Sequence, residues 1–191
     1  MDAIEALSRS IEEFQGRLDQ VQEEDWDKPT PCPNWSVRDL VNHMFLGTRM
    51  TVQLLAGGSR DDVIAGLGDN LLDGSDDISA DFATLAEEMR RGFSAPSGLE
   101  GTVDHPMGEI PRTMFIGFRV LDDTVHSWDL ARGIGANDEL DAEVIGFLWN
   151  EIQPMAGGIK DLGIFGDGAS GNVGEDAPLQ QRYLDLLGRR P

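Results

Sequence analysis

Two residue types that often carry chemistry are scarce in this sequence: it has one cysteine, Cys32, and three histidines among 191 residues. A single cysteine excludes a disulfide bond within the chain, which fits a reducing compartment. Imidazole chemistry, whether acid–base catalysis or metal binding, is restricted to His43, His105 and His126. The search for a functional site therefore begins with four side chains.

Positive charge is scarce as well. The chain has 15 Lys and Arg residues against 35 Asp and Glu residues, so its formal net charge is −20. This balance argues against nucleic-acid binding and against adhesion to anionic membranes. No apolar run approaches the ~20 residues of a membrane span, and the acidic N-terminal stretch does not resemble a signal peptide. These absences predict a cytoplasmic protein with neither a nucleic acid nor a membrane as partner.

The apolar residues that are present recur mostly at steps of three or four, which is the spacing of amphipathic helices. Few segments alternate with period two, so sheet-rich folds are poorly supported. With 40% hydrophobic residues the chain can form a sizeable core. The pattern predicts a single all-α domain: a four-helix bundle with a further helix or tail packed on its side. The predicted helices cover residues 2–24, 37–56, 78–93, 112–132, 140–155 and 178–187.

The connections between these helices are long and rich in proline or glycine. Three prolines in the stretch DKPTPCPNW exclude regular structure there, and Ser36 is a candidate N-cap for the helix that follows. Residues 59–76 are expected to form a loop with one helical turn. Residues 94–110 are expected to form a crossover with a short extended piece at 101–104. Pro111 suits the first turn of the next helix.

The stretch RVLDDTVHSWDLAR, residues 119–132, combines carboxylates with an imidazole. On a helix, Asp122 lies one turn from His126 on the same face. Together with His43 from the preceding part of the bundle, this pair supplies two nitrogen ligands and one oxygen ligand. Such a set suits Zn²⁺ best, with Ni²⁺, Fe²⁺ and Mn²⁺ as alternatives. Three protein ligands leave one position open for water or substrate, which is typical of reactive sites.

Other carboxylates of this stretch have competing interpretations. Asp123 is an alternative ligand, but an exposed helix carboxylate is the preferred interpretation. Asp129 is expected to pair with Arg132 on the surface. A role for Asp129 or Asp39 in holding a ligand imidazole is the alternative.

The remaining candidates are a thiol, a third imidazole and two indoles. Cys32 precedes a helix start and could be a thiolate with His43 as its base, although a small buried apolar residue is the simpler interpretation. His105 could reach the site from the crossover, but a hydrogen bond to nearby backbone is preferred. Trp35 and Trp128 could form walls of the site; the preferred interpretation is that both are core aromatics.

Two motifs resemble a known family: PTPCPNWSVRDLVNHM, followed much later by DDTVHSWDLARGIG. They resemble the DinB-like metal-binding superfamily and, more closely, its actinobacterial branch that includes the mycothiol-dependent maleylpyruvate isomerases. The ending RYLDLLGRRP is similar to that of other members of the branch, so the resemblance covers nearly the whole chain. It implies an up-down-down-up four-helix bundle with a long crossover, as a single domain over residues 1–191. Its core would span about 2–157 and a C-terminal extension about 158–191.

The resemblance also implies a divalent metal held by His43, Asp122 and His126, where Asp122 replaces the glutamate of many relatives. The expected function is a mycothiol- or other thiol-dependent transferase or isomerase, in which a metal-bound thiolate attacks a small electrophile. A non-catalytic metal-binding bundle with a regulatory or structural role is the alternative, and metal-assisted hydrolysis is a weaker one. The protein is expected to be a monomer or a homodimer.

Overall fold

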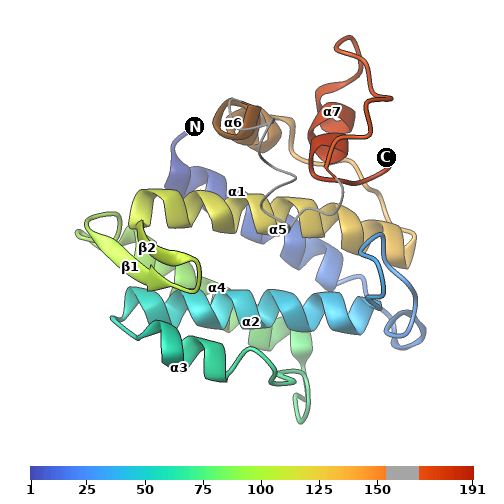
Figure 1. Ribbon diagram of the computed structural model, residues 1–191. Helices are drawn as coiled ribbons and strands as arrows, with labels where there is room; N and C mark the ends of the chain where they lie inside the picture. The colour runs from blue at the N-terminus through green and yellow to red at the C-terminus, as the bar shows by residue number, and fades with distance from the viewer. Residues whose placement is uncertain (154–167) are drawn as a thin grey trace.

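The computed structural model describes residues 1–153 and 168–191, and these form a mostly helical protein (Figure 1). A short 3-10 helix, η1 (Glu23–Asp25), follows the first helix, and a two-stranded antiparallel sheet is formed by β1 (Thr102–His105) and β2 (Gly108–Pro111). The α-helices are α1 (Ala3–Leu18), α2 (Val37–Leu55), α3 (Arg60–Ala65), α4 (Ile78–Ser94), α5 (Arg112–Ile134), α6 (Ala142–Ile152) and α7 (Leu179–Leu186).

Four of these helices form the predicted bundle. Helix α1 packs against α4 and α5, and α2 packs against the same two helices from the other side. Helices α1 and α5 run in one direction while α2 and α4 run in the other, as Figure 1 shows. The up-down-down-up arrangement is therefore confirmed. In this arrangement α2 and α5 are neighbours, so the side chains on their facing sides meet between the two helices.

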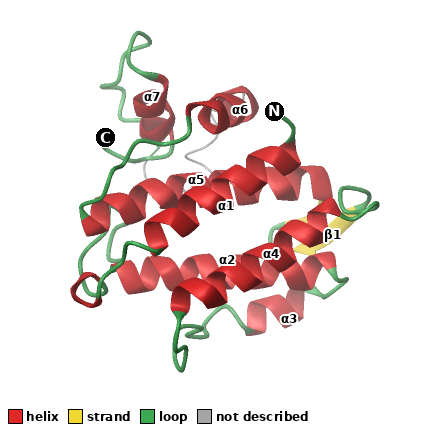
Figure 2. Ribbon diagram, turned by 180° about the vertical axis from the view of Figure 1, so that it is seen from behind, coloured by secondary structure: helices red, strands yellow, loops and turns green. Residues whose placement is uncertain are grey.

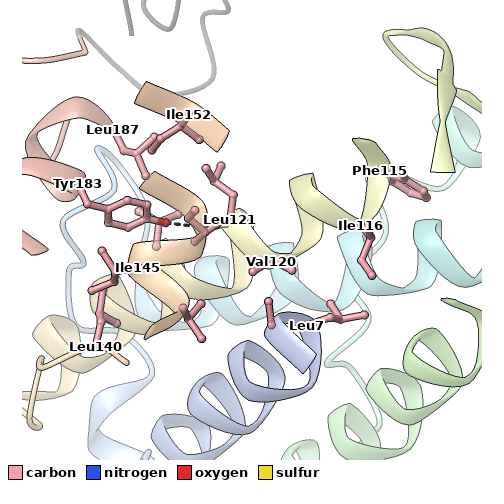
Figure 3. Close-up of a cluster of buried hydrophobic side chains, with 14 of the residues drawn as sticks. Leu7, Phe115, Ile116, Val120, Leu121, Leu140, Ile145, Ile152, Tyr183 and Leu187 are labelled. Carbon is pink, nitrogen blue, oxygen red and sulfur yellow. Dashed lines mark hydrogen bonds between the residues drawn. The ribbon is translucent and has the colours of Figure 1, made fainter. Parts of the chain in front are cut away.

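Helices α6 and α7 lie outside the bundle, on the side formed by α1 and α5 (Figures 1 and 2). Their apolar side chains join those of α1 and α5 in one buried cluster, shown in Figure 3. Within it the Tyr183 hydroxyl donates to the Leu121 carbonyl oxygen at 3.5 Å. Burying each large apolar side chain contributes about 1.5–3 kcal/mol, so this cluster holds α7 against α5. The boundary expected near residue 157 and the last two residues of the helix predicted at 140–155 lie outside the described residues.

Two predicted segments differ in the structure. The helix expected over residues 2–24 ends at Leu18, because the Gln22–Asp25 capping box starts a separate turn after it. The extended piece expected at 101–104 is one strand of a complete β-hairpin, β1 paired with β2. The hairpin turn contains Gly108 at a φ of 120°, a conformation that glycine adopts without steric cost. Pro111 stands at the N-cap of α5, one residue before the helix begins.

Candidate metal centre

The three side chains predicted as metal ligands come together between α2 and α5. His43 projects from α2, and Asp122 and His126 project from α5. The Asp122 carboxylate lies 3.5 Å from His43 Nε2 through Oδ2, and 3.4 Å from His126 Nε2 through Oδ1. The two imidazole ring centres are 4.9 Å apart. One nitrogen from each imidazole and one carboxylate oxygen thus lie within 4.8 Å of one another, as one ion would require.

His43 reaches this point because the sequence defines the start of α2. The Ser36 hydroxyl accepts a hydrogen bond from the Asp39 backbone N–H, and the Asp39 carboxylate accepts one from the Ser36 N–H. This reciprocal capping box fixes the first turn, and His43 follows one turn after Asp39. The carboxylate of Asp39 is therefore committed to the cap and does not hold an imidazole.

A buried arginine positions the carboxylate ligand. Arg119, one turn before Asp122 on α5, donates to the Asp122 and Asp123 carboxylates, at 2.8 Å in each case. Burial favours a neutral Asp122, but Arg119, His43 and His126 outweigh it and hold its pKa well below the usual range. The Asp122 carboxylate is therefore ionised, the form that metal binding would require.

The prediction that Asp123 is an exposed carboxylate is wrong. Its side chain is completely buried, and burial raises its pKa to about 6 despite the neighbouring Arg119. It points to Arg119 rather than to the imidazoles, because adjacent positions on a helix face different directions. Asp123 therefore belongs to the support of the site.

The other ring nitrogen of His126 is held by a second carboxylate. His126 Nδ1 lies 3.0 Å from Asp129 Oδ2, and Asp129 is completely buried. The prediction that Asp129 pairs with Arg132 on the surface is wrong, because Arg132 pairs with Asp138 instead. Asp129 contacts the imidazole of His126, the candidate ligand, as the alternative interpretation expected. Because an ionised carboxylate can only accept, this bond requires the proton on Nδ1, and Nε2 faces Asp122.

Two further groups surround Asp129. The Cys32 Sγ lies 3.2 Å from Asp129 Oδ2 and 3.8 Å from His126 Nδ1, so His126 rather than His43 is its imidazole neighbour. Arg189, from the segment after α7, donates to both Asp129 oxygens at 3.1 and 2.5 Å. Burial would raise the pKa of Asp129, but His126 and Arg189 lower it to about 2. Sequence reasoning missed Arg189; its only signal was the arginine pair in the quoted ending RYLDLLGRRP.

The proline-rich loop supplies one wall of the site. The Thr30 N–H donates to the Trp35 carbonyl oxygen at 3.0 Å, which closes the loop. The Trp35 ring then lies 4.8 Å from the His43 ring and 6.0 Å from the His126 ring, centre to centre. The preferred interpretation of Trp35 as a core residue is therefore replaced by the alternative of a site wall. Trp128 is 2% exposed and is a core residue, as expected.

His105 does not reach the site. It is buried at the end of β1 against Phe115 and Phe118, and its Nδ1 accepts a hydrogen bond from the Met107 N–H at 3.2 Å. The expected bond to nearby backbone is confirmed. Burial, followed by the charges of Arg119 and Arg60, lowers its pKa.

The residues at the centre fit a divalent cation. His43 Nε2 is buried and has no hydrogen-bond partner among the described residues, an arrangement that is costly unless a ligand completes it. Burial lowers the pKa of His126, but Asp122, Asp129 and Cys32 raise it well above its ordinary value. The same negative charges that raise this pKa would also favour a cation beside His126. The side chains of His43 and Asp122 are 38% and 23% exposed, so a small molecule can approach from their side.

The arrangement, two imidazoles and a carboxylate between neighbouring helices of a bundle, is one in which helical bundles can hold a metal. Residues 7–131 match the family described as mycothiol maleylpyruvate isomerase N-terminal domain. The chain belongs to this family. Uncharacterized proteins of Mycobacterium tuberculosis, from strains CDC 1551 / Oshkosh and ATCC 25618 / H37Rv, are each 31% identical to it over 144 residues. That alignment covers 75% of this chain and 74% of theirs.

Two solved structures share the fold. A crystal structure of the mycothiol-dependent maleylpyruvate isomerase superposes with a TM-score of 0.50 and 12% identity, covering 80% of this chain and 70% of that one. A variant of that enzyme, with one histidine replaced by alanine, superposes with a TM-score of 0.55 and 14% identity. It covers 92% of this chain and 74% of the other. At these identities the likeness concerns the fold. None of the helices in the described residues is both long and apolar enough for a membrane span.

Proposed function

We propose that this protein binds a divalent metal, zinc by preference, through His43, Asp122 and His126. With mycothiol or another small thiol it then acts on a small electrophile as a transferase or isomerase. The observation that carries the proposal is the orphaned, buried Nε2 of His43, which faces an ionised carboxylate and a second imidazole. Membership of the mycothiol maleylpyruvate isomerase family supports a thiol as the second reactant. A cytoplasmic location, where such thiols are kept reduced, is part of the proposal.

A bound divalent metal would lower the pKa of a thiol and hold it as the thiolate, which is the nucleophilic form. The chain's own residues prepare that position. Asp122 contributes negative charge, Arg119 fixes its orientation, and Asp129 keeps the His126 proton on Nδ1. The Trp35 ring packs beside both imidazoles and forms one wall of the site. The His43 side chain is 38% exposed, so a thiol and an electrophile can approach the site from its side.

A purely structural metal site is the weaker candidate. Structural zinc sites use four protein ligands, whereas the group between α2 and α5 offers three, and two of its side chains are partly exposed. An open coordination position with solvent access suits a reactant.

The proposal is tested with cobalt in place of zinc, because cobalt–thiolate bonds give a charge-transfer absorption in the near ultraviolet. The protein is loaded with Co²⁺ and titrated with mycothiol and, separately, with its S-methyl derivative. We expect the absorption to appear and saturate with the thiol alone. Cys32→Ala is the matched variant, because it removes the only thiol of the chain. It should leave the titration unchanged.

Consumption of mycothiol against a panel of unsaturated acids, epoxides and other electrophiles completes the test. We expect turnover that depends on added metal. Metal binding without any thiol-dependent absorption or turnover would contradict the reactive role, and failure to bind metal would contradict the site itself.

A further inference from the structure

The C-terminal segment, residues 183–191, contacts the support of the candidate metal centre through one side chain. Arg189 donates from Nε to Asp129 Oδ1 at 3.1 Å and from Nη2 to Asp129 Oδ2 at 2.5 Å. The side chains of Arg189 and Asp129 are 11% and 0% exposed. Asp129 Oδ2 is also 3.0 Å from His126 Nδ1. A continuous series of charge-assisted bonds therefore runs from the end of the chain to a ligand imidazole.

The backbone presents Arg189 to Asp129 in a defined way. After α7 the chain turns at Gly188, whose φ of 76° is a left-handed conformation. The Arg189 N–H then donates to the Leu184 carbonyl oxygen at 2.9 Å, which closes the turn. The guanidinium also donates to the Leu187 carbonyl oxygen at 3.0 Å. Leu184 and Leu187 are completely buried, so the turn is anchored in the hydrophobic cluster that joins α7 to α5.

From this geometry we propose that Arg189 is a positioning residue of the metal centre, and that docking of residues 183–191 and metal binding reinforce each other. The proposal rests on the proposed function only in that a metal binds His126. Arg189 engages both oxygens of Asp129 and so fixes the carboxylate plane, which in turn fixes the plane of the imidazole. Without Arg189 the buried carboxylate can rotate, and His126 loses its orientation.

Coupling in one direction requires coupling in the other, because binding linkage is reciprocal. If Arg189 raises the metal affinity, then a bound metal must favour the docked state of the segment that carries Arg189. This second effect can be measured in the unaltered protein, without any substitution.

The first experiment measures zinc affinity by competition with a chromogenic chelator and records the ligand-field spectrum of the Co²⁺ form. We expect Arg189→Ala to lower zinc affinity about 10–100-fold, the range for removal of outer-shell partners, and to alter the cobalt spectrum. Arg189→Lys keeps the charge but not the two-point contact, so its affinity should be intermediate. Arg190→Ala is the matched control: Arg190 contacts Asp185, and its side chain is 54% exposed. It should keep the affinity of the wild-type protein.

The second experiment measures hydrogen exchange of residues 183–191 in the wild-type protein with and without zinc. We expect zinc to slow exchange in this segment of the wild-type protein. In Arg189→Ala we expect zinc to have no such effect. Equal zinc affinity in Arg189→Ala and wild type, or exchange unaffected by zinc, would overturn the inference while leaving the proposed function intact. A wild-type protein that binds no metal would overturn both. If Arg189→Ala fails to fold, the effect of zinc on hydrogen exchange in the wild-type protein decides whether the inference stands.

Discussion

The two sides of the His126 ring carry similar residue types and have different roles. On the Nε2 side lie Asp122 and His43, and on the Nδ1 side lie Asp129 and Cys32. Each set of three, His126 included, brings its ligand atoms within 4.8 Å, as a metal site would. The Nδ1 side, however, already contains a cation, the guanidinium of Arg189, bonded to the carboxylate and 3.4 Å from the thiol sulfur.

The Nε2 side also contains a guanidinium, that of Arg119, bonded to Asp122 Oδ2 at 2.8 Å. It differs in His43, whose Nε2 is buried without a hydrogen bond in the described part of the chain. The contrast teaches that metal-ligand spacing is insufficient to identify a site. The distinguishing feature is the unmet bonding requirement of a buried imidazole nitrogen, because the carboxylates on both sides are paired with an arginine.

The largest effect is expected from removing His126, the imidazole that the two sides share. We expect His126→Ala to abolish stoichiometric zinc binding, because only one imidazole and one carboxylate would remain on the Nε2 side. Helical content should be largely retained, since the bundle core is apolar. Elemental analysis of untagged protein and circular dichroism measure the two effects. His105→Ala makes the same change away from the site and should retain the metal. Full zinc content in His126→Ala would place the metal elsewhere.

A smaller loss of zinc affinity is expected when only the Nδ1 side of His126 is altered. Asp129→Asn keeps the shape and a hydrogen-bond acceptor but removes the charge that faces His126 and Arg189. We predict that zinc affinity falls about 10–100-fold while binding stays stoichiometric. Chelator competition provides the measurement. An unchanged affinity would show that Asp129 does not orient the ligand.

His105 extends the comparison to an imidazole packed against aromatic rings. Its folded-state pKa lies below the unfolded value of about 6.5, so between the two values the unfolded chain binds more protons. The stability that neutral His105 contributes is therefore present above about pH 6.5 and is lost as pH falls through the folded-state pKa. Urea denaturation at several pH values should show a shallower decline in His105→Gln than in the wild type. Parallel curves for the two proteins would contradict the assignment.

The smallest effect on zinc affinity should come from replacing Cys32. Cys32→Ala removes a sulfur that contacts Asp129 but leaves all three proposed ligands in place. We expect zinc affinity by chelator competition to match that of the wild type. A marked loss would mean that the metal lies on the Nδ1 side of His126, which would reverse the comparison.

The bundle was predictable because helix spacing, caps and breaks are local signals. Ser36 and Asp39 form the capping box that the sequence suggested, and α4 and α5 begin at the residues expected for them. The first helix was overextended, because the apolar Val21 continued its periodicity although the chain had left the helix. Spacing together with family resemblance indicated His43, Asp122 and His126, and the structure brings them together.

The environments of neighbouring acidic residues were not predictable in the same way. Aspartate is usually a surface residue, yet Asp123 and Asp129 are both buried and ion-paired. The partner of Asp129, Arg189, is 60 residues away in sequence and lies in the segment that follows α7. A one-dimensional pattern contains no information on such a contact.

By itself, the sequence determined which segments are helical, where α2 starts and which residue types could hold a metal, because helix periodicity, capping and ligand chemistry depend on nearby residues. The tertiary structure alone decided which ring nitrogen of His126 faces Asp122 and which is held by Asp129. That choice depends on a carboxylate and a guanidinium brought together from distant parts of the chain, and burial makes their charges strong enough to impose it.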